Sequence, residues 1–208
     1  MDFGFFSPLA KLANSALTYF FRLTGNFGAA IVILSVLIQL LLTPLSFKSY
    51  KAMAVMKKIQ PEMQEIQKRY KDDPKRMNAE VMDLYKRHGT NPLGGCLPML
   101  LQIPVFFALF TALRNSWTLH GAPFIFWIKD LSAKDPFYVL PLVMGGIMFL
   151  QQHLSPQTAD PAQAAMMKWM PLIFTFMFLS FPSGLVMYWL INSIWGFAQN
   201  MYLKNKMA

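Results

Sequence analysis

The sequence predicts an all-α membrane protein with five transmembrane helices, an N-terminal amphipathic helix and a cytoplasmic helical hairpin. Of its 208 residues, 55% are hydrophobic and only 14% are charged, whereas about a quarter of the residues of a soluble domain are charged. Charged residues are absent from four long stretches, 23–47, 88–113, 136–159 and 169–203. A helix needs about 20 apolar residues to cross the hydrocarbon layer, so each of the first three stretches accommodates one span.

The fourth stretch is too long for one span. Pro182-Ser183-Gly184 divides it, because proline and glycine together mark a turn. The first of the two resulting helices has to begin before the stretch does, which places Lys168 inside the span, near enough to its end for the ammonium group to reach the interface. The predicted spans are 27–46, 92–115, 136–152, 163–181 and 185–203.

Residues 1–25 are predicted to form an amphipathic helix that lies in the membrane interface. Apolar side chains recur there with near-helical spacing, and polar residues such as Lys11 and Arg22 interleave with them. A cleavable signal peptide is a less favoured alternative, because Asp2 stands at the start and no basic segment precedes an apolar core.

The distribution of basic residues orients the chain. The net charge is +9, and the segment 47–90 carries eleven of the 19 Lys and Arg residues. Basic residues accumulate on the cytoplasmic side of a membrane. The segment 47–90, the loop near 153–162 and the C-terminus are therefore predicted to be cytoplasmic, and the N-terminal helix and the segment 116–135 periplasmic.

The cytoplasmic segment 47–90 reads as two antiparallel helices. Apolar residues from Tyr50 to Tyr70 follow steps of three and four, which is one face of a helix. Asp73 is the expected N-cap of the second helix, and Pro74 its first residue. Gly89 is the expected C-terminal stop of that helix.

A plain structural hairpin explains this segment fully, and a contact surface is the alternative. Flexible methionines suit variable apolar partners, and basic faces suit anionic lipid head groups or ribosomal RNA. On the second interpretation, the residues that contact substrate or ribosome are Met53, Met56, Lys57, Lys58 and Met63.

Polar residues inside the spans are neutral. No carboxylate lies in the interior of any predicted span, which argues against proton-coupled transporters and intramembrane aspartyl proteases. The three histidines are far apart in the sequence, so we expect no metal site, no cofactor and no catalytic constellation. Interhelical hydrogen bonding would explain any one of the neutral residues, but Gln39 is a full amide in an aliphatic run and must be paired or hydrated.

Several short motifs follow one another along nearly the whole chain. They are Asn91-Pro92-Leu93-Gly94-Gly95-Cys96-Leu97-Pro98, Gln102-Ile103-Pro104-Val105-Phe106, Ala122-Pro123-Phe124, Trp127-Ile128-Lys129-Asp130-Leu131-Ser132, Asp135-Pro136 and Phe181-Pro182-Ser183-Gly184-Leu185 with Tyr188. In sequence and in order, these motifs resemble those of the YidC/Oxa/Alb family of membrane protein insertases, of the type found in Gram-negative bacteria.

The resemblance implies a hydrophilic groove among the five spans, open to the cytoplasm and to lipid. A hydrophobic segment of a nascent protein would enter this groove and move into the bacterial inner membrane beside the first and fourth spans, without ATP hydrolysis by the insertase. The implied partners are nascent membrane proteins, lipids, the ribosome and the Sec translocon. The groove residues expected here are Ser35, Gln39, Gln102, Met144, Phe174 and Asn192.

The chain departs from the family in two respects. The family's groove carries an arginine on the first span, and the matching position here is Gln39, which keeps hydrogen-bonding capacity but lacks the positive charge. Gram-negative members also have an additional N-terminal span and a large periplasmic domain, which we expect to be missing from this chain.

A small polar-lined channel or transporter is the alternative function, and a structural assembly subunit is a third. The basic, methionine-rich hairpin joined to uncharged spans favours the insertase, because a transporter does not require such a hairpin.

Overall fold

The computed structural model describes residues 7–91, 97–115, 121–154 and 161–207. Over these ranges the chain forms seven α-helices and no β-strand. The helices are α1 (Ser7–Thr24), α2 (Phe27–Arg69), α3 (Pro74–Arg87), α4 (Leu97–Asn115), α5 (Val139–Leu154), α6 (Pro161–Phe178) and α7 (Ser183–Met207). The all-helical class predicted from the sequence is confirmed for this part of the chain.

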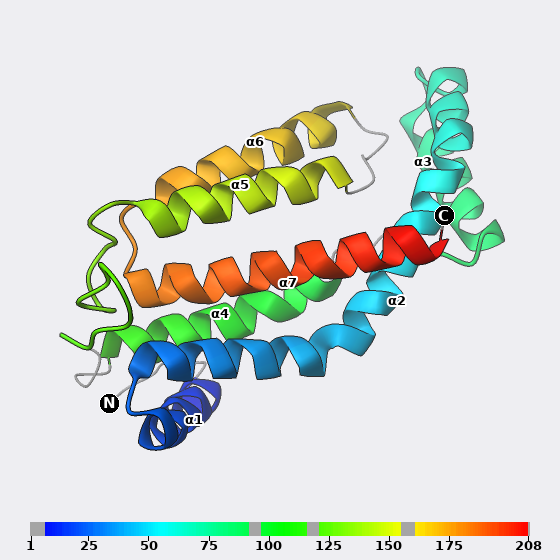
Figure 1. Cartoon of the computed structure of the whole chain (residues 1–208). Coiled ribbons are helices and arrows are strands. Elements are labelled where there is room, and N and C mark those ends of the chain that lie inside the picture. Colours follow the sequence, from blue (N-terminus) through cyan, green and yellow to red (C-terminus); the bar gives the residue numbers. More distant parts are fainter. Residues whose placement is uncertain (1–6, 92–96, 116–120, 155–160, 208) are drawn as a thin grey trace.

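Helix α7 is the central element of the bundle. It contacts α2, α4 and α5, while α6 packs on the far side of α5 (Figure 1). Helix α1 packs against α2 and α4, and α3 lies at the opposite end of the molecule, beside the C-terminal part of α2 (Figure 1). This arrangement gathers the main apolar core around α7, where Leu185, Val186 and Tyr188 have no exposed surface.

Helix α2 runs without a break through both the first predicted span and the first helix of the predicted hairpin. Pro44 and Pro61 both lie inside it. A proline removes one backbone donor and bends a helix, but it need not end one when the flanking turns are well packed. No helix ends near residue 46, where the first predicted span ends. That span boundary stays a prediction about where α2 leaves the membrane.

A small core of its own joins α3 to α2. Ile59 and Met63 on α2 pack against Leu84 and Tyr85 on α3, and the Tyr85 hydroxyl donates to Met63 Sδ at 3.7 Å. Burial raises the pKa of the Tyr85 hydroxyl. Asp73 caps α3 by accepting from the Arg76 N–H at 3.1 Å, so the predicted N-cap is confirmed.

Apolar length distinguishes α2 from the other helices. Among the described residues, it is the one helix whose length and hydropathy would let it cross a membrane by composition alone. Leu100–Leu113, Val139–Leu154 and Met166–Phe178 are shorter apolar helices. The count of five spans accordingly remains a prediction.

Replacing Gly145 by alanine is expected to destabilise the packing of α5 on α6. A Cβ atom at Gly145 would lie 2.1 Å from Thr175 Oγ1, and the Thr175 hydroxyl is already committed to the Pro171 carbonyl at 2.7 Å. Overpacking of this kind costs about 1–3 kcal/mol. Thermal unfolding in detergent measures the loss.

The neighbouring glycine supplies the matched control. A Cβ atom at Gly146 would meet nothing within 4 Å, so Gly146→Ala gains the same helix propensity without the clash. The double variant Gly145→Ala/Thr175→Ala should recover part of the loss. Equal midpoints for Gly145→Ala and Gly146→Ala would contradict the close helix contact.

Candidate functional site

A buried pair of amides joins α2 to α7. Gln39 Nε2 donates to Asn192 Oδ1 at 2.5 Å, and Gln39 is 8% exposed. An unpaired amide in an apolar environment costs several kcal/mol, which this pairing largely avoids. The sequence-based expectation that Gln39 must be paired or hydrated is met by a partner 153 residues away.

The polar contacts continue from this pair to α4. Gln102 Nε2 donates to the hydroxyl of Tyr188, a residue with no exposed surface that lies one helical turn before Asn192 on α7. Three helices thus contribute polar side chains to one region inside an apolar bundle. Low local dielectric strengthens the hydrogen bonds in such a region.

Further contacts extend this polar region along α2 and α7. Thr43 Oγ1 accepts from Gln199 Nε2 at 2.9 Å and from Trp195 Nε1 at 3.3 Å, and it donates to the Gln39 carbonyl at 2.7 Å. We call the whole set the polar seam. Its members are Gln39, Thr43, Gln102, Tyr188, Asn192, Trp195 and Gln199.

The polar seam has hydrogen-bonding capacity to spare. Within the described ranges, Asn192 Nδ2 in the seam is buried and meets no acceptor, and the same holds for Asn200 Nδ2, further along α7. Tyr50 on α2 reaches the same side of α7, where its hydroxyl donates to the Gly196 carbonyl at 3.2 Å. The seam therefore offers polar contacts along much of the α2–α7 interface.

The other expected groove residues lie in different surroundings. Ser35 is 1% exposed and donates to the Ile31 carbonyl of its own helix at 2.6 Å. Met144 is fully buried in the main core, and the Phe174 ring stacks on Trp189 with centroids 5.5 Å apart. The structure therefore brings Gln39, Gln102 and Asn192 together. It places Ser35, Met144 and Phe174 elsewhere, in the packed parts of the bundle.

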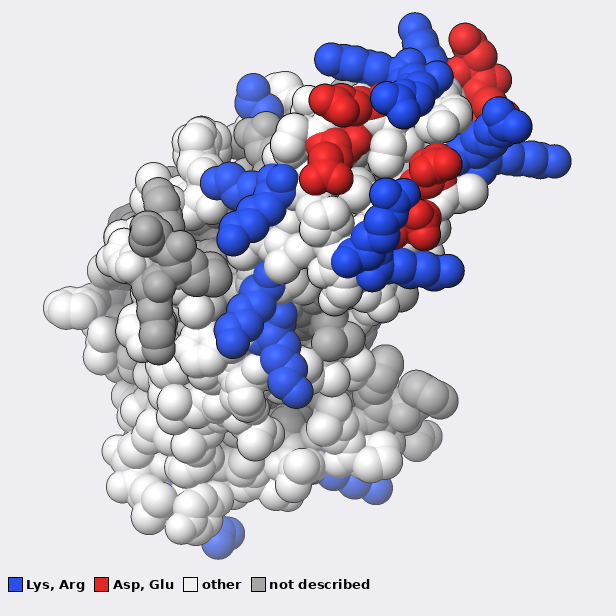
Figure 2. Space-filling model, turned by 90° about the vertical axis from the view of Figure 1, so that its right-hand side faces the viewer, with Lys and Arg blue, Asp and Glu red and all other residues white. Residues whose placement is uncertain are grey.

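The expected contact residues of the hairpin separate into a buried and an exposed set. Met63 holds α3 against α2 and is 7% exposed, with Met56 packed beside it. Lys57 and Lys58 are exposed, and Met53 is half-buried. Charged side chains of both signs gather on this end of the molecule, whereas the rest of the visible face carries scattered basic side chains and no acidic ones (Figure 2).

Two aspartates fix the loop between α4 and α5. Asp135 is 2% exposed, and it accepts from Trp127 Nε1 at 3.0 Å, from Phe137 N at 3.1 Å and from Leu140 N at 2.8 Å. For Asp130, burial raises the pKa, but hydrogen bonds from Ser132, Gly121 and Ala133 outweigh it and leave the pKa below its usual value. Asp135 was not a candidate from the sequence, although an aspartate just before a helix is a capping signal.

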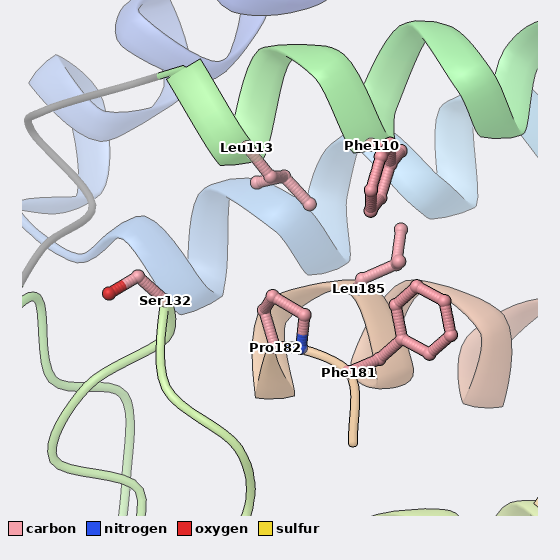
Figure 3. Close-up of a pocket in the computed structure, with 6 residues that line it drawn as sticks. All are labelled: Phe110, Leu113, Ser132, Phe181, Pro182 and Leu185. Atoms are coloured by element: carbon pink, nitrogen blue, oxygen red, sulfur yellow. The ribbon is translucent and has the colours of Figure 1, made fainter. Parts of the chain in front are cut away.

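The same loop closes over the turn between α6 and α7. Ser183 N donates to the Ala133 carbonyl at 2.7 Å, and Gly184 N donates to the Leu131 carbonyl at 2.9 Å. A cavity of about 340 Å³ lies beside this junction, lined by Phe110, Leu113, Ser132, Phe181, Pro182 and Leu185 (Figure 3). Its lining is apolar except for one serine, so it offers no charged group to a ligand.

No group of three or more His, Cys, Asp or Glu residues in the described ranges is placed to hold a metal ion. The polar seam is built from amides, hydroxyls and the Trp195 indole N–H, which bind by hydrogen bonding and remain uncharged near neutral pH. Its chemistry is therefore limited to neutral hydrogen bonding inside an apolar bundle.

Comparisons with known proteins agree with one another on the family. The family model described as 60Kd inner membrane protein matches residues 19–208. A membrane protein insertase YidC from Geobacter sp. (strain M21) is 53% identical over 203 residues, covering 98% of this chain and 38% of the relative. One from Citrifermentans bemidjiense is 52% identical over 208 residues, covering 100% of this chain and 39% of the relative.

A solved structure shows the same fold. It is described as an active YidC insertase crystal structure with the first transmembrane domain resolved, and it superposes with a TM-score of 0.71 at 28% identity, over 94% of this chain and 46% of that chain. The chain spans about two fifths of the length of the curated relatives it matches. Together the sequence match, the relatives and the shared fold confirm the resemblance seen in the motifs, and the chain belongs to the 60Kd inner membrane protein family, the family of the YidC insertases.

Proposed function

We propose that this chain is the core of a membrane protein insertase and chaperone of the bacterial inner membrane. It accepts hydrophobic segments of nascent proteins in a lipid-open hydrophilic groove and releases them into the bilayer, with no ATP hydrolysis of its own. In this proposal the five predicted spans cross the membrane, α3 and the C-terminus are cytoplasmic, and α1 lies on the periplasmic side.

The polar seam is the observation that supports this proposal most directly. A nascent segment that inserts must carry a short polar tail across about 30 Å of hydrocarbon, and every unpaired polar group costs several kcal/mol there. Amides and hydroxyls of Gln39, Thr43 and Asn192 offer that tail hydrogen-bond partners within the bundle. The apolar segment itself needs only lipid, which suits a groove that is open on one side.

The absence of charge in the seam sets its selectivity. Neutral amides donate and accept without preferring either sign, so tails of either charge are handled by hydrogen bonding alone. We propose that Lys57 and Lys58, both exposed on α2, provide the contact with ribosomal RNA or with anionic head groups near the cytoplasmic surface. The Sec translocon is a further proposed partner of the whole protein.

Site-specific crosslinking to a stalled nascent chain tests the proposal. A photoreactive residue at position 39 should label the nascent chain, and one at Leu41, which is 78% exposed on the same helix, should label lipid. Labelling from position 144 is expected only if the helices part, because Met144 is fully buried in this structure, whereas Phe174 is partly exposed and a photoreactive residue there should label the nascent chain directly.

Two outcomes would contradict the insertase function. One is labelling from position 39 that is confined to lipid. The other is ion conduction by the purified protein without integration of a single-span substrate into proteoliposomes, which would favour the channel.

A further inference from the structure

The loop between α4 and α5 presents large apolar side chains to the outside of the molecule. Phe126 is 86% exposed, Phe137 is 65%, Ile125 is 49% and Tyr138 is 37%. We call these four residues the aromatic loop face. The loop lies at the end of the bundle opposite α3 (Figure 1).

Hydrogen bonds fix this loop in place. A single oxygen, Asp135 Oδ1, accepts from the Trp127 indole and from the Phe137 backbone N–H, and the Phe126 ring stacks on Trp127 with centroids 6.0 Å apart. The two most exposed rings are therefore tied to one buried carboxylate. These contacts hold the two rings in fixed, solvent-facing positions.

Two members of the aromatic loop face occupy unfavourable backbone conformations. Phe126 has φ 54° and Tyr138 has φ 56°, both in the left-handed region. Bulky residues rarely adopt this region, and glycine would do so without steric cost. A large ring kept at a position that favours glycine points to a role for the ring itself.

Lysines flank these aromatic side chains. Lys129 and Lys134 are exposed, and neither lies within 4.0 Å of a carboxylate oxygen in the part of the chain that the structure describes. Lys134 Nζ lies 6.0 Å from the centroid of the Tyr138 ring. Exposed rings beside unpaired ammonium groups match the head-group region of a bilayer, where aromatic rings settle and phosphates attract lysine.

We propose that the aromatic loop face inserts into the head-group boundary of the periplasmic leaflet and anchors this end of the bundle to lipid. Phe126 and Phe137 enter the boundary, and Lys129 and Lys134 stay at the phosphates. The inference rests on the membrane orientation in the proposed function. It adds a lipid contact to a loop that would otherwise only connect two spans, and it sets the depth of α7 through the loop's bonds to Ser183 and Gly184.

Depth-dependent fluorescence quenching tests this proposal. Cys96 is the only cysteine in the sequence, so Cys96→Ser provides a background for single labels. A nitrobenzoxadiazole label at Phe126→Cys, and separately at Phe137→Cys, is examined in vesicles of phosphatidylethanolamine and phosphatidylglycerol that carry bromine near the head-group end or near the tail end of the acyl chains. Lipids brominated near the head group should quench either label at least twofold more than lipids brominated near the tail end.

Two control labels separate failure of the anchor from failure of the membrane orientation. Ile103→Cys on α4, 43% exposed, should be quenched strongly by lipid, and Lys129→Cys only weakly. Quenching at 103 with none at 126 and 137 would overturn the anchor and leave the insertase proposal standing. Absence of quenching at all of these positions would overturn both the anchor and the membrane orientation. A label at position 126 whose emission indicates a nonpolar environment, but which lipid does not quench, would assign the loop to a protein partner and overturn the lipid contact.

Discussion

Asp135→Ala is expected to lower the free energy of unfolding by about 3 kcal/mol. The carboxylate is 2% exposed and accepts three hydrogen bonds, two of them from backbone N–H groups of Phe137, just before α5, and Leu140, in its first turn. Hydrogen bonds to a charged group contribute about 1.5–3 kcal/mol each, although losses within one network are not additive. For a chain of this length the change corresponds to a fall of roughly 6–12 °C in Tm, which thermal unfolding followed by tryptophan fluorescence measures.

Two further variants test the cause of this loss. Asp135→Asn keeps one acceptor oxygen and should lose less than alanine does. Asp83→Ala removes an exposed carboxylate that pairs with Arg87 at 2.6 Å, and pairs of this kind contribute less than about 1 kcal/mol. If Asp135→Ala unfolded at the same temperature as Asp83→Ala, the loop would not depend on this carboxylate.

Under the proposed insertase function, Gln39→Arg is expected to raise the insertion of substrates with acidic tails by about fivefold relative to substrates with neutral tails. At an effective dielectric constant of about 20, opposite unit charges 4 Å apart attract by about 4 kcal/mol. Desolvation offsets most of this, and a residual of roughly 1 kcal/mol corresponds to the stated ratio. Proteoliposomes given single-span substrates that differ only by Asp or Asn in the tail provide the measurement.

A neutral replacement at the same position separates charge from hydrogen bonding. Gln39→Met has similar volume, leaves Asn192 Oδ1 without its donor, and should reduce insertion of both substrates alike. Equal insertion of the acidic-tailed substrate by the Gln39 and Gln39→Arg proteins would refute the role assigned to charge at this position.

Local features of the fold were predictable because their causes are local. Asp73 and Pro74 mark the start of α3 within a few residues of sequence, and Pro182-Ser183-Gly184 marks the turn into α7. The span boundary expected near residue 46 stays a prediction about the membrane, because hydropathy changes there while the backbone hydrogen-bonding pattern of α2 continues past Pro44. Composition thus locates a change of surroundings more reliably than an end of a helix.

The candidate site was only partly predictable. Gln39 stood out because an amide in an aliphatic run needs a partner, and the sequence offered Gln102 and Asn192 as further polar residues. It did not indicate that Gln39 meets Asn192, that Gln102 meets Tyr188, or that Met144 is fully buried in the core. These contacts depend on the rotation of each helix about its axis, which apolar spans surrounded by lipid leave open.

The sequence by itself determined the helical class, the family and the separation of charge from apolar surface. Each of these follows from short-range composition and spacing, and each is legible before any helix is packed against another. Only the tertiary structure decided which polar groups pair inside the bundle and that Asp135 holds Phe126 and Phe137 outward. Such pairings join residues from different helices and from an irregular loop, and their geometry is set by close packing of the whole chain.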